Sequence, residues 1–108
     1  MKAAEIAARR GHQVNLYEEK ERLGGRFLLA AIPPKKEILK EFVEHLTREL
    51  AKSSVKIVSG KPFDPALLEK DRPDVAIVAT GAKPFFPPID GIQEAKAISV
   101  EEALSGEV

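Results

Sequence analysis

The sequence predicts an α/β protein with an incomplete doubly wound parallel sheet, one that lacks its first strand and its glycine-rich loop. Two observations predict this class. Helical and extended segments alternate in the order α-β-α-β-α-β over residues 1–80, with the strands about as far apart as βαβ crossovers require. The opening "MKAAEIAARRGHQVNLYEE" is typical of the helix and strand that come after a phosphate-binding loop in nucleotide-binding βαβ units, yet no strand and no G-x-G-x-x-G precede it.

Residues 2–10 are predicted to form a helix, and residues 14–17 the strand after it. Alanine-rich segments favour helix, and Gly11 lies where a helix stop is expected. The alanines together with Ile6 give a small, flat apolar face, which lets a helix lie close to a sheet. Apolar and polar residues alternate in "QVNLYEE", as they do in a strand. A charged turn, "EKERLGGRF", then closes on two adjacent glycines.

The clearest helix is predicted over residues 35–52, where apolar residues recur at helical spacing. Before it, "LLAAIPP" is an apolar stretch that ends on two prolines. After it, "VKIVSG" at residues 55–60 predicts a second strand. Asp64 and Pro65 make a good N-cap and first-turn pair, so a short helix is expected over residues 66–69.

A third strand is predicted at residues 75–80. The run "DVAIVATGA" is continuously apolar, which suits a central parallel strand buried on both faces. "KPFFPPIDGI" is too rich in proline for regular structure, and Ser99 is placed to cap a last helical turn. We expect the sheet to close by pairing strands in the order 55–59, 14–17, 75–80, or to associate into a homo-oligomer through exposed sheet edges.

The composition excludes several classes of function. Lysine plus arginine and aspartate plus glutamate number 17 each in 108 residues, which gives no reason to expect nucleic acid or an anionic membrane as a partner. There is no cysteine and there are only two histidines, so no disulfide, no thiolate nucleophile and no metal site are expected. No apolar run reaches the length of a membrane span, and no signal peptide is recognised, so a cytoplasmic protein is expected.

Three short patterns are candidates for ligand binding, and each has a plainer alternative. Glu18 follows a predicted strand, where a carboxylate offers two acceptor oxygens to the vicinal hydroxyls of a ribose, but it also belongs to a solvated charge run. Gly25 and its glycine neighbour let backbone approach a ligand, or simply make a turn. Thr80 and Gly81 end a predicted buried strand, where open α/β sheets bind ligands, or merely end it. The basic side chains Arg26, Lys35 and Lys36 suit anionic oxygens or solvent equally.

The succession of these patterns resembles the 2,4-dienoyl-CoA reductase, 2-enoate reductase and NADH:flavin oxidoreductase family, which is related to old yellow enzyme. The segments that carry the resemblance are "AARRGHQVNLYEEKERLGGRFLLAAIPPKKEI", "VAIVATGAKPFFPPIDGI" and "VEEAL". The resemblance implies that residues 1–108 form a partial FAD-binding, Rossmann-like domain. It places Met1 just after the last glycine of the family's G-G-G-P-A-G loop and Val108 just before an expected NAD(P)H-binding domain.

The resemblance assigns cofactor-binding positions and no catalytic residue. Glu18 matches the acid that binds the adenosine ribose of FAD, and residues 61–63 match a stretch whose backbone meets the adenine. Pro62 departs from that pattern, because it has no N–H and offers only its carbonyl. Gly25 and Arg26 match the G-G-Q/R segment that approaches the flavin nucleotide. Lys35 matches a basic residue after the I-P-x segment, and Thr80 and Gly81 match the A-T-G motif near the pyrophosphate.

The implied function is that of a segment of an NAD(P)H-dependent flavin oxidoreductase, which relays electrons from NAD(P)H through FAD to an FMN domain. The NAD(P)H site, the FMN and an iron–sulfur cluster are expected elsewhere in the parent protein, and the segment alone is expected to bind FAD weakly or not at all and to be inactive. Two alternatives stay open. One is a stand-alone nucleotide- or partner-binding module completed in trans, and the other is an inert truncated remnant.

Overall fold

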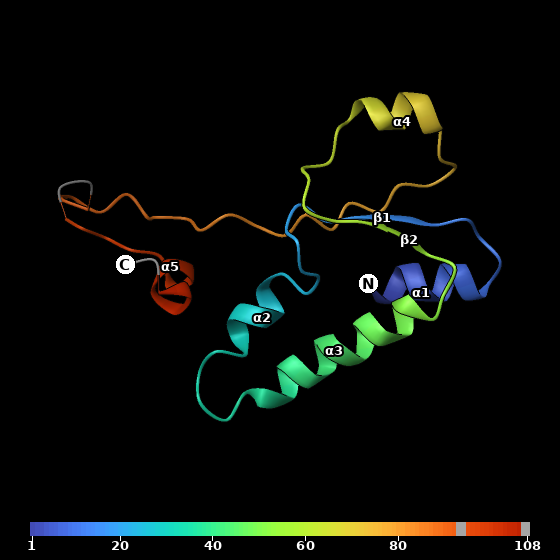
Figure 1. Ribbon diagram of the computed structural model, residues 1–108. Helices are drawn as coiled ribbons and strands as arrows, with labels where there is room; N and C mark the ends of the chain where they lie inside the picture. The colour runs from blue at the N-terminus through green and yellow to red at the C-terminus, as the bar shows by residue number, and fades with distance from the viewer. Residues whose placement is uncertain (93–94, 107–108) are drawn as a thin grey trace. The chain divides into compact units, whose positions relative to one another are not determined.

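The structure is a computed structural model that describes residues 1–92 and 95–106 (Figure 1). It divides into two units, Met1–Ile77 and Val78–Val108, and each is described by itself. Two strands and five helices are assigned in these residues: α1 (Lys2–Arg9), β1 (Asn15–Tyr17), α2 (Arg26–Ala30), α3 (Glu37–Ala51), β2 (Lys56–Val58), α4 (Ala66–Asp71) and α5 (Val100–Ser105).

The sheet of the first unit consists of β1 and β2, which pair in parallel. Leu16 lies opposite Ile57, and Tyr17 lies opposite Val58. Backbone hydrogen bonds extend the pairing at both ends, from Lys56 N to Val14 O at 2.9 Å and from Glu18 N to Val58 O at 2.9 Å. Because the strands are parallel, their carboxyl ends meet at one edge of the sheet. The predicted α/β class with a parallel sheet is confirmed at this coarse level.

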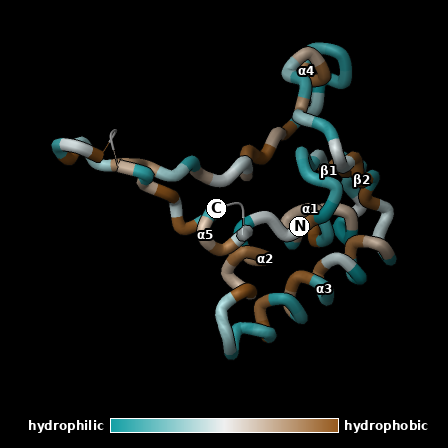
Figure 2. Tube along the Cα trace, turned by 60° about the vertical axis from the view of Figure 1, so that its left-hand side comes forward, coloured by the Kyte–Doolittle hydropathy of each residue, from teal (hydrophilic) through white to brown (hydrophobic). Residues whose placement is uncertain are grey.

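Helices α1 and α3 lie on the same side of the two strands in both views (Figures 1 and 2). Apolar residues recur at helical spacing along α3, and two of them, Val43 and Leu50, are buried, with 3% and 1% exposure. With Leu23 they make up the buried apolar core of the described residues. The core is thus small and gathers along α3.

Helix α2 packs on α3 through the rings of Phe27 and Phe42, whose centroids are 5.8 Å apart. No helix is predicted from "LLAAIPP", so α2 is a feature that the sequence pattern misses. The predicted helix at residues 35–52 is confirmed as α3, which begins later because Lys35 adopts a left-handed φ of 63°. A short helix forms after Asp64 as predicted, but its N-cap is Pro65 and not Asp64, whose carboxylate accepts a hydrogen bond from Ala66 N at 2.9 Å.

The third strand predicted at residues 75–80 is wrong. The segment has no regular secondary structure, and the sheet holds only β1 and β2 in the described residues. Val75, Ile77 and Val78 are 75%, 72% and 83% exposed. A strand forms only where a neighbouring strand accepts its backbone hydrogen bonds, and the described residues provide none for this segment. Figure 2 shows the hydrophobic colour of this stretch after α4.

The second unit is mostly irregular up to α5. As predicted, Ser99 caps this helix: its hydroxyl oxygen accepts from Glu102 N at 3.2 Å, and Glu102 accepts from Ser99 N at 2.6 Å. The hydrogen bond that the backbone N–H of Ser99 donates to the Glu102 carboxylate is the main cause that lowers the pKa of Glu102 below its ordinary value. In residues 1–92 and 95–106, no helix has the length and apolar character needed to cross a membrane.

Candidate functional site

The carboxyl edge of the sheet brings together two of the predicted cofactor segments. Glu18 follows β1 directly, and residues 61–63 follow β2. Two hydrogen bonds join the segments that follow β1 and β2. Glu18 N donates to Val58 O at 2.9 Å, and Gly60 N donates to Lys20 O at 3.1 Å. Ligands of open parallel sheets bind beyond the carboxyl ends of the strands, so this edge is the candidate site.

The Glu18 side chain is half-buried at this edge. Its Oε1 accepts a hydrogen bond from the backbone N–H of Lys20 at 3.0 Å. This contact orients the carboxylate, while a carboxylate has about four lone-pair sites and so keeps acceptor capacity for further donors. Vicinal hydroxyl groups are one such pair of donors.

An aromatic contact joins the two loops. The rings of Tyr17 and Phe63 meet edge to face, with centroids 5.0 Å apart and planes at 68°. Tyr17 is half-buried at the end of β1, whereas Phe63 is 40% exposed. The resemblance assigns a role only to the backbone of residues 61–63, so this ring pair is missed from the sequence. The signal that could have indicated it is the position of both aromatic residues close to predicted strand ends.

Pro62 lies in the loop after β2, as predicted, and is exposed. Since its nitrogen carries no hydrogen, the loop has one backbone donor fewer at the point where the resemblance expects the backbone to meet a base. The carbonyl of Pro62 stays as an acceptor.

The two adjacent glycines before α2 have different surroundings. A β-carbon on Gly24 would lie 2.6 Å from Val43 Cγ1, so this glycine permits the close packing of the turn on α3. A β-carbon on Gly25 would meet nothing within 4 Å. Gly25 has φ 48° and ψ −128° and is the N-cap of α2, with Arg26 as its first residue. Packing therefore explains Gly24, while the open side of Gly25 is free for an approaching group.

Lys35 lies in the turn between α2 and α3 and is exposed. It is one of the described non-glycine residues with positive φ, at 63°. Such a conformation is uncommon for a lysine and holds the chain in a tight turn after two prolines. No hydrogen bond in the described residues links Lys35 to the carboxyl edge of the sheet.

Thr80 and Gly81 belong to the second unit, and both are exposed. Gly81 has φ 79°, and a β-carbon there would meet nothing within 4 Å. Both residues are described within the second unit alone.

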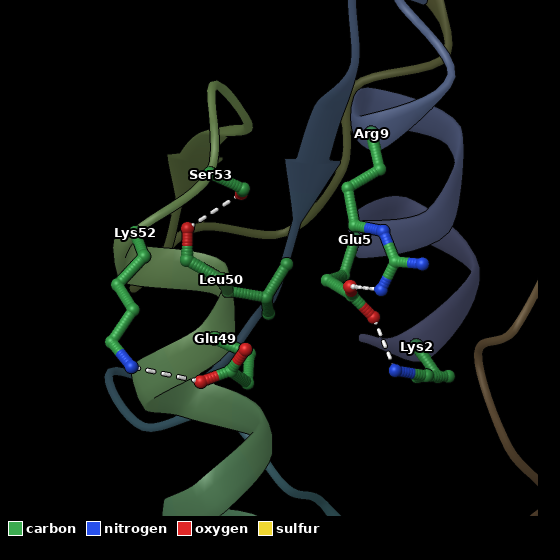
Figure 3. A network of polar contacts seen from close by, with 7 residues as sticks. All are labelled: Lys2, Glu5, Arg9, Glu49, Leu50, Lys52 and Ser53. Atoms are coloured by element: carbon green, nitrogen blue, oxygen red, sulfur yellow. Dashed lines mark hydrogen bonds and ion pairs between the residues drawn. The ribbon is translucent and has the colours of Figure 1, made fainter.

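Two sets of polar contacts lie away from the candidate site, one within α1 and one at the end of α3 (Figure 3). Glu5 is 4% exposed, and its carboxylate pairs with Lys2 and, at 3.0 Å, with Arg9 Nη1. The hydrogen bond from Lys2 is the main cause that lowers the pKa of Glu5, and Arg9 adds to it. On α3, the hydrogen bond from Lys52 lowers the pKa of Glu49 in the same way. Each set of ion pairs joins side chains of its own helix.

Two shallow hollows occur on the first unit. One, of about 370 Å³, lies on the small-residue face of α1 and includes Ala7 and His12. The other, of about 470 Å³, lies between α3 and β2, with Ile57 and Val43 in its wall. Neither hollow includes a residue that the resemblance assigns to the cofactor. In the described residues, no group of three or more histidine or acidic side chains is placed to hold a metal ion.

Comparison with known proteins gives relatives along the whole chain, although no family model matches it. The chain is 38% identical over 110 residues to an NADH oxidase of Thermoanaerobacter brockii, covering 100% of this chain and 17% of the relative. It is 34% identical over 114 residues to a bilirubin reductase of Mediterraneibacter gnavus, covering 100% of this chain and 18% of the relative.

A solved structure has the same fold as the chain. The 2-naphthoyl-CoA reductase in complex with 2-naphthoyl-CoA superposes with a TM-score of 0.91 at 29% identity, over 99% of this chain and 16% of that one. The chain therefore spans about one sixth of the length of the proteins that it matches.

Proposed function

Over its whole length the chain belongs with the reductases of the 2,4-dienoyl-CoA reductase, 2-enoate reductase and NADH:flavin oxidoreductase family, and on this premise we propose that it forms part of their FAD-binding region. In this role it contributes to the site for the adenosine half of FAD. The full-length protein is an NAD(P)H-dependent flavin oxidoreductase of the cytoplasm, and its NAD(P)H, FMN and iron–sulfur sites lie in other parts of the polypeptide.

The observation that carries the proposal is the meeting of Glu18 and the 61–63 loop at the carboxyl edge of a parallel pair of strands. The residues present fit an adenosine. Glu18 supplies acceptors for ribose hydroxyls. The loop after β2 lies next to the loop that holds Glu18, because Gly60 N donates a hydrogen bond to Lys20 O. Gly25 and Arg26 are proposed to approach the flavin half, with Lys35, Thr80 and Gly81 as further contacts to its phosphates.

A titration of the purified chain with FAD tests the proposal, followed by the quenching of flavin fluorescence. Saturable binding that Glu18→Ala weakens, and that Glu19→Ala leaves unchanged, would support it. Glu19 is the matched control because it is the adjacent glutamate and is exposed. Binding that is insensitive to Glu18→Ala would remove the ribose role. A chain that binds no FAD until it is extended by an upstream strand and glycine loop would place the cofactor affinity in the extended protein.

A second candidate function is favoured by the exposed apolar segment at residues 75–78. Such a segment is suited to pair with a strand from another chain, so that a separate polypeptide completes a nucleotide-binding module. This candidate predicts that a chain carrying the glycine loop, added in trans, raises FAD affinity and protects the amides of residues 75–78 from hydrogen exchange. Lack of both effects would leave the first function.

A further inference from the structure

We propose that the exposed ring of Phe63 is the platform on which the purine base of the adenine nucleotide stacks, with Tyr17 holding that ring in place. The inference rests on the proposed function, and it names a side-chain contact where the resemblance implies only backbone contacts. It concerns the chemistry of base recognition at the carboxyl edge of the sheet.

The position of Phe63 carries the first step. The residue is five positions beyond the end of β2, in the loop that leaves the carboxyl edge beside Glu18. A base attached to a ribose held by Glu18 would lie near the loops at this edge. Phe63 is the aromatic side chain of that loop, and it is 40% exposed.

The contact with Tyr17 carries the second step. An exposed phenylalanine on a loop normally samples several rotamers, and ordering it on binding would cost affinity. Here the edge-to-face contact, with centroids 5.0 Å apart, fixes one ring against the other before any ligand arrives. Tyr17 is itself fixed, because it pairs with Val58 in the sheet.

Pro62 carries the third step. A loop that reads adenine through its backbone uses N–H groups as well as carbonyl groups, and Pro62 offers only its carbonyl. Stacking on an aromatic ring needs no donor and is worth enough to change affinity severalfold to about a hundredfold per base. The loop after β2 is therefore better equipped to hold a base by the face of Phe63 than by backbone hydrogen bonds.

A single-tryptophan variant tests the inference directly. The sequence contains no tryptophan, so Phe63→Trp places the sole indole of the chain at the proposed platform and keeps an aromatic face there. The matched control is Phe42→Trp, which replaces a 47% exposed phenylalanine on α3, outside the carboxyl edge. Both proteins are titrated with AMP, with FAD and with FMN, which has no adenine, and the indole fluorescence is followed.

The expected result is saturable quenching of the indole in Phe63→Trp by AMP and by FAD, with FMN ineffective, and no quenching by AMP in Phe42→Trp. In parallel, Phe63→Leu should weaken FAD binding roughly tenfold while Phe63→Trp retains it, which separates stacking from loss of fold. Tyr17→Leu should weaken FAD binding by a smaller factor.

Two outcomes would overturn the inference, and they are distinguishable. If FAD binds and Glu18→Ala weakens it, but Phe63→Leu does not and AMP leaves the indole unquenched, the platform is wrong and the proposed function stands. If neither AMP nor FAD binds to any of these proteins, even after each is extended by an upstream strand and glycine loop, both the platform and the proposed function fail.

Discussion

The carboxylate of Glu21 lies against the α-carbon of Gly60. A β-carbon added at Gly60 would be 2.5 Å from Glu21 Oε1 and 2.9 Å from its carboxyl carbon. Gly60 also has φ 77° and donates its N–H to Lys20 O at 3.1 Å. Gly60 thus stabilises the turn after Glu18 through its hydrogen bond to Lys20 and leaves room for the side chain of Glu21.

Gly60→Ala is expected to weaken FAD binding as well as stability. The alanine is strained at positive φ by about 1–2 kcal/mol, and its β-carbon pushes aside the Glu21 carboxylate, which lies in the turn after Glu18. Gly11→Ala is the matched control, because Gly11 has φ 89° but a β-carbon there meets nothing within 4 Å. Urea unfolding and FAD titration should show a similar stability loss in both variants and a loss of affinity only in Gly60→Ala. Equal FAD affinities would contradict a role of Gly60 in positioning the turn.

The two glycines before α2 are expected to respond differently to alanine. Both have backbone conformations that favour glycine, with φ 122° at Gly24 and 48° at Gly25. Only at Gly24 would the new β-carbon press on a buried side chain, since Val43 is 3% exposed. Gly24→Ala should therefore cost about 1–3 kcal/mol more than Gly25→Ala in the free energy of unfolding. Equal losses would show that α2 shifts freely on α3.

The FAD affinity of Gly25→Ala tests whether the ligand approaches this glycine. At this position the β-carbon points into open space, so any loss of FAD affinity beyond the loss of stability reflects a group that approaches from outside. The affinity should fall in Gly25→Ala even under conditions where circular dichroism shows the chain fully folded. Unchanged affinity would remove Gly25 from the proposed flavin contacts.

Local sequence patterns were sufficient for the helices that carry their own signals. The apolar period of α3 and the cap at Ser99 depend on residues within one or two turns, so they could be predicted. The third strand at residues 75–80 was predicted wrongly, because a strand forms only with a partner strand, and the local pattern does not show whether one is present. Helix α2 was missed for the same reason: five residues are too few to be stable alone, and packing of Phe27 on Phe42 holds them.

The residues of the candidate site could be predicted only where the ends of the strands could be predicted. Glu18 lies at the carboxyl edge because β1 ends at Tyr17, which the alternation of "QVNLYEE" indicated. The contact of Tyr17 with Phe63 depends on the register of β1 on β2, which no local pattern specifies. Glu21 and Gly60 meet through the same register.

The stability of the first unit is expected to fall in acid because of Glu5. Its pKa is lowered mainly by the hydrogen bond from Lys2, so the ionised carboxylate is favoured in the folded state. The stabilisation is present above the ordinary pKa of 4.5 and is lost as the pH falls through the lowered pKa of the folded state. Thermal unfolding between pH 7 and pH 3 should show a smaller difference between wild type and Glu5→Gln at the acid end.

The control for this titration is Glu41→Gln, which removes a negative charge from an exposed position on α3. Glu49 and Lys52 also face the region from α3, and they are the same in all three proteins. A difference between wild type and Glu5→Gln that is constant with pH would show that the ion pairs of Glu5 do not stabilise the fold.

Leu50→Ala should be the most destabilising single truncation on α3. Leu50 is the side chain most completely buried in the described residues, at 1% exposure, and it lies on the side of α3 that faces Glu5 of α1 (Figure 3). Removing its methyl groups costs the lost transfer free energy and leaves a cavity, together about 2–5 kcal/mol. Ile38→Ala on the same helix is the matched control, since Ile38 is 67% exposed and its truncation should change stability by less than about 0.5 kcal/mol. Urea denaturation of the two variants measures this difference. A similar small effect in both would mean that the α1–α3 contact does not hold the first unit together, and that the fold of this segment depends on the polypeptide around it.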